Sequence, residues 1–159
     1  MTNVVVRKAV EKDAEGIQAL VNELALYEKA PEEVSTSADD IRRFGFGKEQ
    51  LFEAFVADHD GVIVGFALCF WKYSTWKGKA LYLEDFYVKP TYRKDKIGKD
   101  LFTKVVELAK IEGANRMEWL VLDWNELGLE FYKKIGATLD ETWITGMLFP
   151  RDFDRLLTS

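Results

Sequence analysis

The order of strand-like and helix-like segments along the 159-residue chain predicts an α/β fold, with a single mixed central sheet of six to seven strands and helices on both faces. Residues 51–58 and 62–71 are apolar almost throughout, which is typical of strands covered on both faces. Segments with helical periodicity precede and follow these runs. We also expect one domain over residues 1–159, because this length suits one core and no linker or repeat interrupts it.

Six segments are predicted to be strands from their β-branched and aromatic content. Asp60 and Gly61, between the second and third segments, are a strong hairpin signal. Pro90 ends the fourth segment, because proline has no N–H to donate to a strand ladder. The six predicted strands are residues 4–7, 51–58, 62–71, 81–88, 116–122 and 143–149.

Four helices are predicted from apolar positions at helical spacing and from capping residues. Asp13 is a candidate N-cap for the first helix. Ser37, with Asp40 three residues later, indicates a capping box for the second. The helices are expected at residues 13–28, 37–44, 97–113 and 125–134, and the residues after 149 are expected to form a polar tail.

The composition excludes several classes of protein. With 22 Lys and Arg against 27 Asp and Glu, the net charge of −5 argues against general nucleic-acid binding, which needs a basic surface. Cys69 is a single cysteine and His59 a single histidine, so neither an internal disulfide, a histidine-based triad nor a metal site is expected. We interpret Cys69 as a core thiol and His59 as a turn residue. With no signal peptide or long apolar span, we expect a reduced, cytoplasmic protein.

Residues 81–101 combine two features of opposite charge. The strand carries the adjacent carboxylates Glu84 and Asp85, and the turn at 92–99 is rich in Arg and Lys and leads directly into a helix. The free N–H groups and the dipole at a helix N-terminus suit a phosphate, while carboxylates suit a cation. One crossover could therefore hold an anionic cofactor beside a cationic substrate.

This stretch also carries a family resemblance. Residues 93–98 resemble an altered form of R-x-x-G-x-G/A, the pyrophosphate-binding motif of the GNAT acetyltransferases. Four further matches lie in order along the chain, so the likeness runs from about residue 4 to 149: YSTWKG at 73–78, YLEDFYV at 82–88, VLDWN at 121–125 and FYKKIGA at 131–137. The chain is similar to the spermidine/spermine N-acetyltransferase branch, and YSTWKG and VLDWN are closer to its thialysine N-epsilon-acetyltransferase members.

The resemblance implies the GNAT fold, acetyl-CoA as co-substrate without a metal, a small cationic amine as substrate, and a homodimer. An aliphatic amine has a pKa of about 10.4, so it arrives as ammonium and must lose a proton before it reacts. Glu84 is the candidate base; alternatively it is an edge-strand charge. Asp85 reaches the same substrate only if the strand bulges, and the family has a bulge there that also turns the Phe86 N–H toward the thioester oxygen. Tyr132 matches the catalytic tyrosine that protonates the departing thiolate, although its spacing alone favours packing.

The cofactor is expected along the central strand and the basic turn. Lys96 stands where the motif has a glycine, and Lys94 where this branch commonly has another, so loop geometry and affinity differ from the family. Alternatively, these lysines form a solvated basic turn. Asn125 is expected to cap the following helix and to contact the pantetheine arm, which main-chain groups at 86–88 pair like an added strand. The expected cofactor-binding residues are Phe86, Tyr87, Val88, Arg93, Lys94, Asp95, Lys96, Ile97, Gly98, Lys99, Asn125, Gly128 and Tyr132.

The substrate is expected where carboxylates meet indole rings, which attract an alkylammonium through charge and cation–π contacts. By resemblance, Glu141 and Trp143 reach the pocket of a partner subunit. Alternatively, Trp119 and Trp143 are core aromatics, and Glu28 is a solvated helix end. The expected substrate-binding residues are Tyr27, Glu28, Trp76, Glu84, Asp85, Glu118, Trp119, Leu120, Glu141 and Trp143.

We therefore expect an N-acetyltransferase that transfers acetyl to a small primary amine by direct attack in a ternary complex. A lysine analogue such as thialysine or a diamine is favoured, because Ser74 replaces the aspartate of the polyamine-specific members. Spermidine or spermine is the alternative substrate. A non-catalytic coenzyme A-binding module is the rival from another class, and acetylation of a protein lysine is a third possibility that the bulky Trp76 disfavours.

Overall fold

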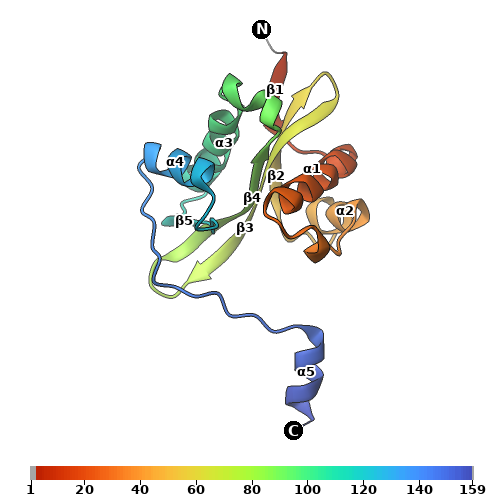
Figure 1. The fold of residues 1–159 in the computed structure, drawn as a ribbon, viewed down its shortest axis with the longest axis vertical. Coiled ribbons are helices and arrows are strands. Elements are labelled where there is room, and N and C mark those ends of the chain that lie inside the picture. The colour runs from red at the N-terminus through yellow and green to blue at the C-terminus, as the bar shows by residue number, and fades with distance from the viewer. Residues whose placement is uncertain (1–2, 159) are drawn as a thin grey trace. The chain divides into compact units, whose positions relative to one another are not determined.

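The structure, a computed structural model, describes residues 3–158. The chain forms two compact units, Met1–Leu120 and Val121–Ser159 (Figure 1). One domain over the whole chain stays a prediction.

The first unit is built on a five-stranded sheet with the order β1-β2-β3-β4-β5. Neighbouring strands are antiparallel from β1 to β4, whereas β5 lies parallel to β4. The strands are β1 (Val4–Lys8), β2 (Glu53–His59), β3 (Val62–Ser74), β4 (Gly78–Val88) and β5 (Arg116–Glu118).

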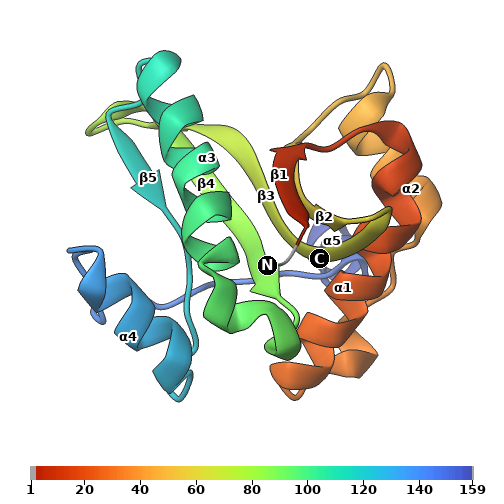
Figure 2. The same ribbon diagram turned by 90° about the horizontal axis from the view of Figure 1, so that it is seen from above.

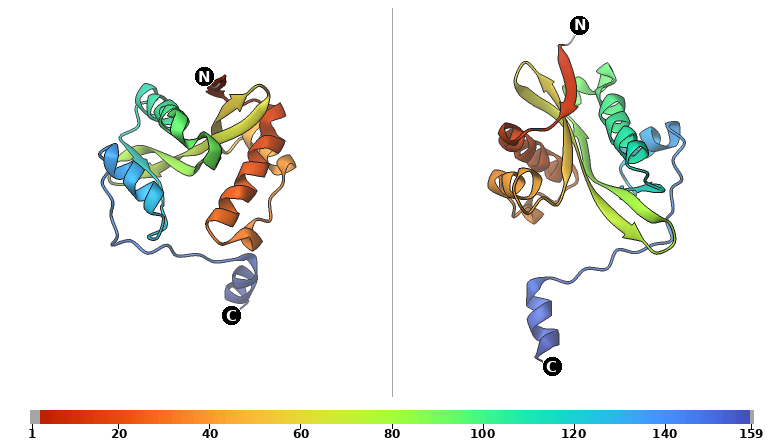
Figure 3. Two further views of the ribbon diagram at one scale, coloured as in Figure 1. Left: turned by 45° about the horizontal axis from the view of Figure 1, so that its top comes forward. Right: turned by 180° about the vertical axis from the view of Figure 1, so that it is seen from behind.

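Helices cover both faces of this sheet. α1 (Ala14–Tyr27) and α2 (Ala38–Phe46) lie on one face and α3 (Ile97–Ile111) on the other (Figure 2). The hairpin of β3 and β4 extends beyond these helices (Figure 3). Ile17 and Leu20 of α1 pack with Val56 and Phe66 of the sheet in one fully buried core. Three short 3-10 helices complete the unit: η1 (Glu11–Asp13), η2 (Pro31–Glu33) and η3 (Pro90–Asp95).

Local signals predicted several turns and caps correctly. Asp60 and Gly61 both have positive φ, at 50° and 90°, as a tight two-residue hairpin turn requires. The capping box at α2 is confirmed, because Asp40 accepts a hydrogen bond of 2.8 Å from the Ser37 N–H. Asp13 does stand at the N-cap of α1, but its side chain is turned to Arg7 and the Val10 N–H instead of the helix.

The second unit contains α4 (Glu126–Lys134) and α5 (Pro150–Leu157). Asn125 caps α4 as predicted, since its Oδ1 accepts a hydrogen bond of 3.0 Å from the Gly128 N–H. The segment expected as a polar tail is exposed but helical over residues 150–157, with Pro150 in the first turn and Asp152 accepting from the Phe149 N–H at 2.9 Å.

The expected sheet of six to seven strands is also wrong for the described residues 3–158, which hold five. The fifth strand stops at Glu118 instead of residue 122, and residues 143–149 form no strand at all. A strand exists only where a neighbour supplies its hydrogen-bonded ladder, and among residues 3–158 no segment pairs with 143–149. Within residues 3–158, no helix is both long enough and apolar enough to cross a membrane.

Candidate active site

The site begins with an irregularity in β4. Leu68 of β3 lies opposite Asp85, but the next residue, Cys69, lies opposite Leu83, so Glu84 is an extra residue without a partner in the register. This is the bulge that the adjacent carboxylates required. Since successive residues of a regular strand point to opposite faces, only such a bulge lets Glu84 and Asp85 act on the same face.

Three carboxylates meet at this bulge. Burial, with the nearby charges of Glu84 and Glu28 acting in the same direction, raises the pKa of Asp85 to about 7. Burial also raises the pKa of Glu28, which ends α1 as its C-cap. Among residues 3–158 none of the three forms an ion pair. The cluster therefore lacks the cation that would stabilise it.

The basic turn follows β4 directly. η3 leads to Lys96, which has a left-handed φ of 63° and is the N-cap residue of α3. The first backbone bond into the helix runs from the Asp100 N–H to the Lys96 carbonyl at 3.0 Å, which leaves the N–H groups of residues 97–99 for other acceptors. Lys94, Lys96 and Lys99 are all exposed. This arrangement suits an anion.

Gly98 lies on the first turn of α3, above the end of β4. A Cβ atom at this position would lie 3.5 Å from the Phe86 ring and 3.8 Å from Val88, both ordinary contact distances. Packing within the unit therefore does not require glycine here. The bare backbone instead leaves room beside the helix N-terminus, as a phosphate-binding turn needs.

Arg93 does not point to the helix N-terminus. Its Nε donates to the Val88 carbonyl at 2.9 Å, and its guanidinium lies over the rings of Tyr27 and Tyr87 at 5.7 Å and 5.5 Å from their centroids. The arginine thus ties the basic turn to the end of α1, where Tyr27 was expected to contact the substrate.

The interpretation of His59 as a turn residue is wrong, because His59 is the last residue of β2 and pairs with Val62 of β3. Its Nδ1 is 2.6 Å from the Tyr92 hydroxyl, and the two rings meet edge to face with centroids 5.4 Å apart. This contact joins the hairpin of β2 and β3 to the basic turn. No local pattern could indicate it, because the two residues are 33 positions apart.

The expected aromatic side chains have two different environments. Trp119 is half-buried and packs edge to face on Phe102 at 5.5 Å, which agrees with the interpretation as a packing residue. Phe86 also packs edge to face with Phe102, with the ring centroids 5.8 Å apart. Trp76 at the hairpin tip and Leu120 are instead 77% and 70% exposed.

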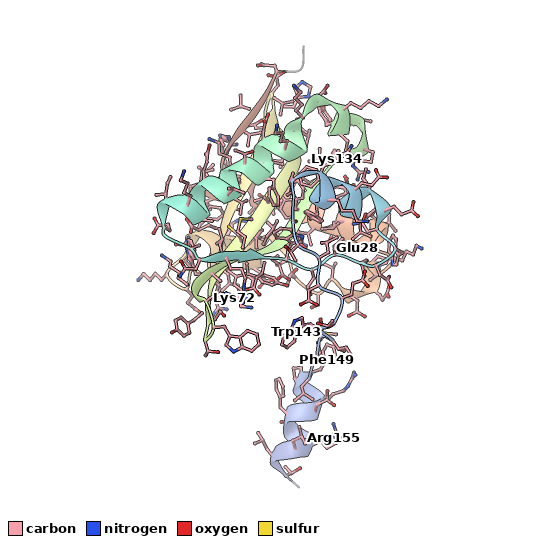
Figure 4. All side chains as sticks on the ribbon, turned by 90° about the vertical axis from the view of Figure 1, so that its left-hand side faces the viewer. Glu28, Lys72, Lys134, Trp143, Phe149 and Arg155 are labelled. Carbon is pink, nitrogen blue, oxygen red and sulfur yellow. The ribbon has the colours of Figure 1, made fainter. Side chains whose placement is uncertain are left out.

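Glu118 lies in a cluster of charges that the sequence did not reveal. It pairs with Lys72 at 3.2 Å and with Arg116 at 3.4 Å, and Arg116 also donates to the Ser74 hydroxyl at 3.2 Å. Lys72 lies over the Tyr82 ring, 5.6 Å from its centroid. Figure 4 labels Lys72 on the β3–β4 hairpin and Glu28 at the end of α1. The only signal was the pair of charges at positions 116 and 118 of one predicted strand, because Lys72 was predicted to lie in a loop.

The remaining candidate residues belong to the second unit. A Cβ atom at Gly128 would lie 2.8 Å from Asn125 Nδ2, so glycine is needed for the Asn125 side chain to fold over the start of α4. Tyr132 is buried, with its ring at 5.5 Å from Phe131. Glu141 is exposed. Trp143 is 70% exposed and donates to Asp140 at 3.0 Å, so the alternative of a core aromatic is wrong for this residue (Figure 4).

A separate hollow of about 470 Å³ lies at the other end of α1, lined by Arg7, Asp13 and Asp58 among others. Arg7 donates to Asp13 at 2.7 Å and 2.9 Å and to Asp58 at 2.9 Å. Burial of Asp13 opposes ionisation, but the hydrogen bonds from Arg7 and from the Val10 N–H outweigh it and lower the pKa of this carboxyl. These charges satisfy one another, so we interpret the hollow as structural.

Comparisons with known proteins agree with this geometry. The acetyltransferase (GNAT) family matches residues 17–137. A thialysine N-epsilon-acetyltransferase of Bos taurus is 39% identical over 145 residues, which cover 86% of this chain and 85% of that protein. A spermidine/spermine N(1)-acetyltransferase-like protein 1 of Homo sapiens is 33% identical over 87% of this chain and 21% of its own length.

Among solved structures, an aminoglycoside N-acetyltransferase AAC(6')-Iy in complex with CoA has a TM-score of 0.72 at 18% identity, and the match covers 93% of this chain and 96% of that one. This likeness concerns the fold. The family match spans more than half of the chain and includes the bulged strand, the basic turn and α4. The chain is an N-acetyltransferase and belongs to the GNAT family of acetyltransferases.

Proposed function

We propose that this protein is an acetyl-CoA-dependent N-acetyltransferase of a small primary amine, and that residues 1–159 act as one domain. The observation that carries the proposal is the bulge of β4, which gathers Glu84, Asp85 and Glu28 immediately before the anion-suited start of α3. A cationic amine and an anionic cofactor would thus bind at the two ends of one short chain segment. The family match over residues 17–137 supports the single domain.

Acetyl-CoA supplies the acetyl group as an activated thioester. The pyrophosphate would be held by the N–H groups of residues 97–99, with charge from Lys94, Lys96 and Lys99. The main chain at 86–88 would pair with the pantetheine arm, and Asn125 and Gly128 would contact it from the start of α4. The exposed lysines, the open first turn of α3 and the space beside Gly98 support this fit. Arg93 would act by holding the turn against Tyr27 and Tyr87.

The carboxylates would manage the proton of the incoming ammonium. A proton acceptor works best when its pKa is near the working pH, and Asp85 has a pKa of about 7. Glu84 and Asp85 would therefore share the role of proton acceptor, which the sequence assigned to Glu84 alone. Glu84 is exposed, so it would be the first of the two to meet the incoming amine. Tyr132 would donate the proton that the departing thiolate needs.

Direct attack by the amine in a ternary complex is supported by the state of the one thiol. Cys69 is buried in the sheet, and burial together with the charge of Glu53 raises its pKa to about 12, so it is a poor acyl carrier. The same free thiol supports a reduced, cytoplasmic setting.

We favour a lysine analogue such as thialysine, or a diamine, over spermidine. The printed activity of the bovine relative, thialysine N-epsilon-acetylation, supports this choice, as does Ser74 in place of an aspartate. The human spermidine/spermine relative keeps the polyamine as the alternative.

We also propose a homodimer. Trp143, Ile144 and Met147 are 70%, 95% and 70% exposed, which is an unusual apolar surface for a monomer. A second copy would cover this segment and would bring Glu141 and Trp143 toward the substrate of its partner. Sedimentation of the wild type and of a Trp143→Glu, Ile144→Glu variant tests this: a monomeric wild type would exclude it.

Steady-state kinetics with acetyl-CoA and a panel of amines tests the activity. Wild type should acetylate a small amine, and Tyr132→Phe should lower kcat by about 100-fold, the usual contribution of a positioned proton donor. A wild type that binds coenzyme A with no turnover of any amine would favour the rival non-catalytic module. Unchanged rates in Tyr132→Phe would remove Tyr132 from the mechanism.

A further inference from the structure

Lys72, Glu118 and Arg116 come from two strands that flank β4 and meet on one face of the sheet. Ala80 of β4 lies opposite both Lys72 of β3 and Arg116 of β5, and Tyr82 lies opposite Glu118. The ion pairs from Glu118 to Lys72 and Arg116 show that the three charged side chains share this face. We call this group the cation cluster.

The cation cluster carries one more positive charge than its internal pairing uses. Two cations share the single carboxylate of Glu118. The Arg116 Nε–H is buried and has no acceptor among residues 3–158, which is an unfavourable state for a charged group. Lys72 and Arg116 remain 38% and 35% exposed, so an anion can reach them. A carboxylate bound at the exposed ends of these two side chains would supply the missing negative charge.

The carboxylates at the bulge lie on the same face. Leu68, opposite Asp85, and Lys72 are four residues apart on β3, an even number that places their side chains on one side. Tyr82 lies between the two groups along β4, because it stands opposite Glu118 and precedes the bulge. Burial and the charges of Glu84, Glu118 and Asp85 raise the pKa of its phenol. At a strand rise of about 3.3 Å per residue, Tyr82 and Asp85 are about 10 Å apart along β4.

We propose that the cation cluster binds the α-carboxylate of an amino-acid substrate whose distal amine is acetylated at the bulge. Lys72 and Arg116 hold the carboxylate, Glu118 holds the α-ammonium, and the distal nitrogen reaches Glu84 and Asp85. The charge pattern of the face is then complementary to an extended, lysine-like zwitterion. A diamine or polyamine has no anionic end and would leave the cluster unmatched. This inference rests on the proposed acetyltransferase function and assigns the residues that recognise the carboxylate end of its substrate.

Ser74 supports the same arrangement. Its hydroxyl accepts hydrogen bonds from Arg116 at 3.2 Å and from the N–H groups of Trp76 and Lys77 at 3.2 Å and 3.1 Å. It thus fixes the hairpin turn and orients the guanidinium without neutralising it. Ser74 is therefore a positioning residue for the carboxylate site.

The first test changes only the substrate. Initial rates of wild type are compared for lysine, lysinamide and pentane-1,5-diamine, and for thialysine, at saturating acetyl-CoA. We expect kcat/KM to fall by about 10- to 100-fold when the carboxylate is amidated or removed, because a charged group then loses its partner. Equal or higher kcat/KM for the diamine would overturn the inference, while no turnover of any amine would instead count against the proposed function.

The second test changes the protein. Lys72→Met and Arg116→Gln should each raise KM for lysine or thialysine about tenfold at constant kcat, since they remove binding that ground and transition states share. Their kinetics with pentane-1,5-diamine should stay within about twofold of wild type. Thermal unfolding checks that each variant is folded. We expect both to fold, because each variant leaves Glu118 paired with one cation. Equal losses for the amino acid and the diamine would overturn the inference.

Lys79→Met is the matched control. Lys79 also pairs with a glutamate, Glu112 at 3.6 Å, and also lies over an aromatic ring, Trp71 at 4.4 Å. It stands next to Ala80 in β4, so its side chain points to the opposite face. It should leave the preference for the carboxylate unchanged; a change equal to that of Lys72→Met would show that only net charge matters and would overturn the inference.

Discussion

Acidic side chains lie at both ends of helix α1, but only those at the N-terminal end are paired with a cation. At the N-terminal end, Asp13 and Asp58 share the guanidinium of Arg7 at hydrogen-bond distance. The pKa of each carboxyl lies below its usual value, through Arg7 and backbone N–H donors. This end is neutralised within the fold itself.

At the C-terminal end, Glu28 faces the bulge that carries Glu84 and Asp85, and no cation of residues 3–158 pairs with them. Placing unpaired acids together costs stability, so such a group persists where a ligand uses it. The two acid clusters thus differ in role: the cluster that the fold pairs with a cation is structural, and the cluster that the fold leaves unpaired is available to a ligand.

Removing the charge of Asp85 should have the largest effect. If the bulge takes the proton of the amine, Asp85→Asn should lower kcat/KM at pH 7 by about 100- to 1,000-fold, with unchanged affinity for coenzyme A. Glu15→Gln at the other end of α1, where Glu15 pairs with Arg42, is the control and should stay within about twofold. Equal activity of Asp85→Asn and wild type would remove the functional role of the bulge.

Removing the cation at the N-terminal end should affect stability and leave the chemistry intact. Arg7→Met leaves Asp13, which is only 5% exposed, as an uncompensated charge, so unfolding in urea should show a loss of about 3 kcal/mol. Lys8→Met, in the same strand, breaks the exposed pair with Glu53 and should cost below about 1 kcal/mol. Similar losses for both variants would show that the Arg7 network is an ordinary surface contact.

The raised pKa of Asp85 predicts that the stability of the protein falls as the pH rises. A carboxyl whose pKa is raised by folding, as for Asp85, gives its stability below the unfolded pKa of about 3.9, and this stability is lost as the pH rises through 7. The stability of wild type relative to Asp85→Asn should therefore fall by about 1–2 kcal/mol between pH 4 and pH 8, a figure reduced for partial exposure. Glu32→Gln, an exposed acid, serves as the control. A difference that is constant with pH would contradict the raised pKa of Asp85.

The sequence predicted features that depend on neighbouring residues. The Asp60-Gly61 turn, the Ser37–Asp40 capping box and the Asn125 cap are all set within four residues, and all are confirmed. The bulge could be predicted because the chemistry needs Glu84 and Asp85 on one face, which a regular strand forbids.

Features that depend on distant pairing could not be predicted. The cation cluster joins residues 46 positions apart, from Lys72 to Glu118, through the register of three strands. The motif placed Arg93 in the cofactor loop, but the rings of Tyr27 and Tyr87, which no motif includes, decide where its guanidinium lies. Residues 143–149 have the composition of a strand, and composition supplies no neighbour to pair with.

The N-terminus of α3 carries unpaired positive charges, whereas the bulge of β4 carries unpaired negative ones. Lys94, Lys96 and Lys99 are exposed and form no ion pair within residues 3–158. The fold therefore supplies no anion to these lysines, just as it supplies no cation to the carboxylates at the bulge. Lys96 adds a cost of its own, because its φ of 63° is a conformation that disfavours any side chain with a Cβ by about 1 kcal/mol.

Two substitutions of Lys96 separate its charge from its backbone. Lys96→Gly removes both the charge and the strain and should stabilise the fold by about 0.5–1 kcal/mol, whereas Lys96→Ala removes the charge alone and should not. In calorimetry, Lys96→Ala should bind coenzyme A about threefold more weakly, with a weaker dependence on salt, because one exposed contact to the pyrophosphate is lost. If Lys96→Gly binds as weakly as Lys96→Ala, charge governs the turn. If it recovers wild-type affinity, the freedom of the backbone compensates for the lost charge. Wild-type affinity in both variants would show that Lys96 faces solvent only, which would restrict the anion site to the N–H groups of α3.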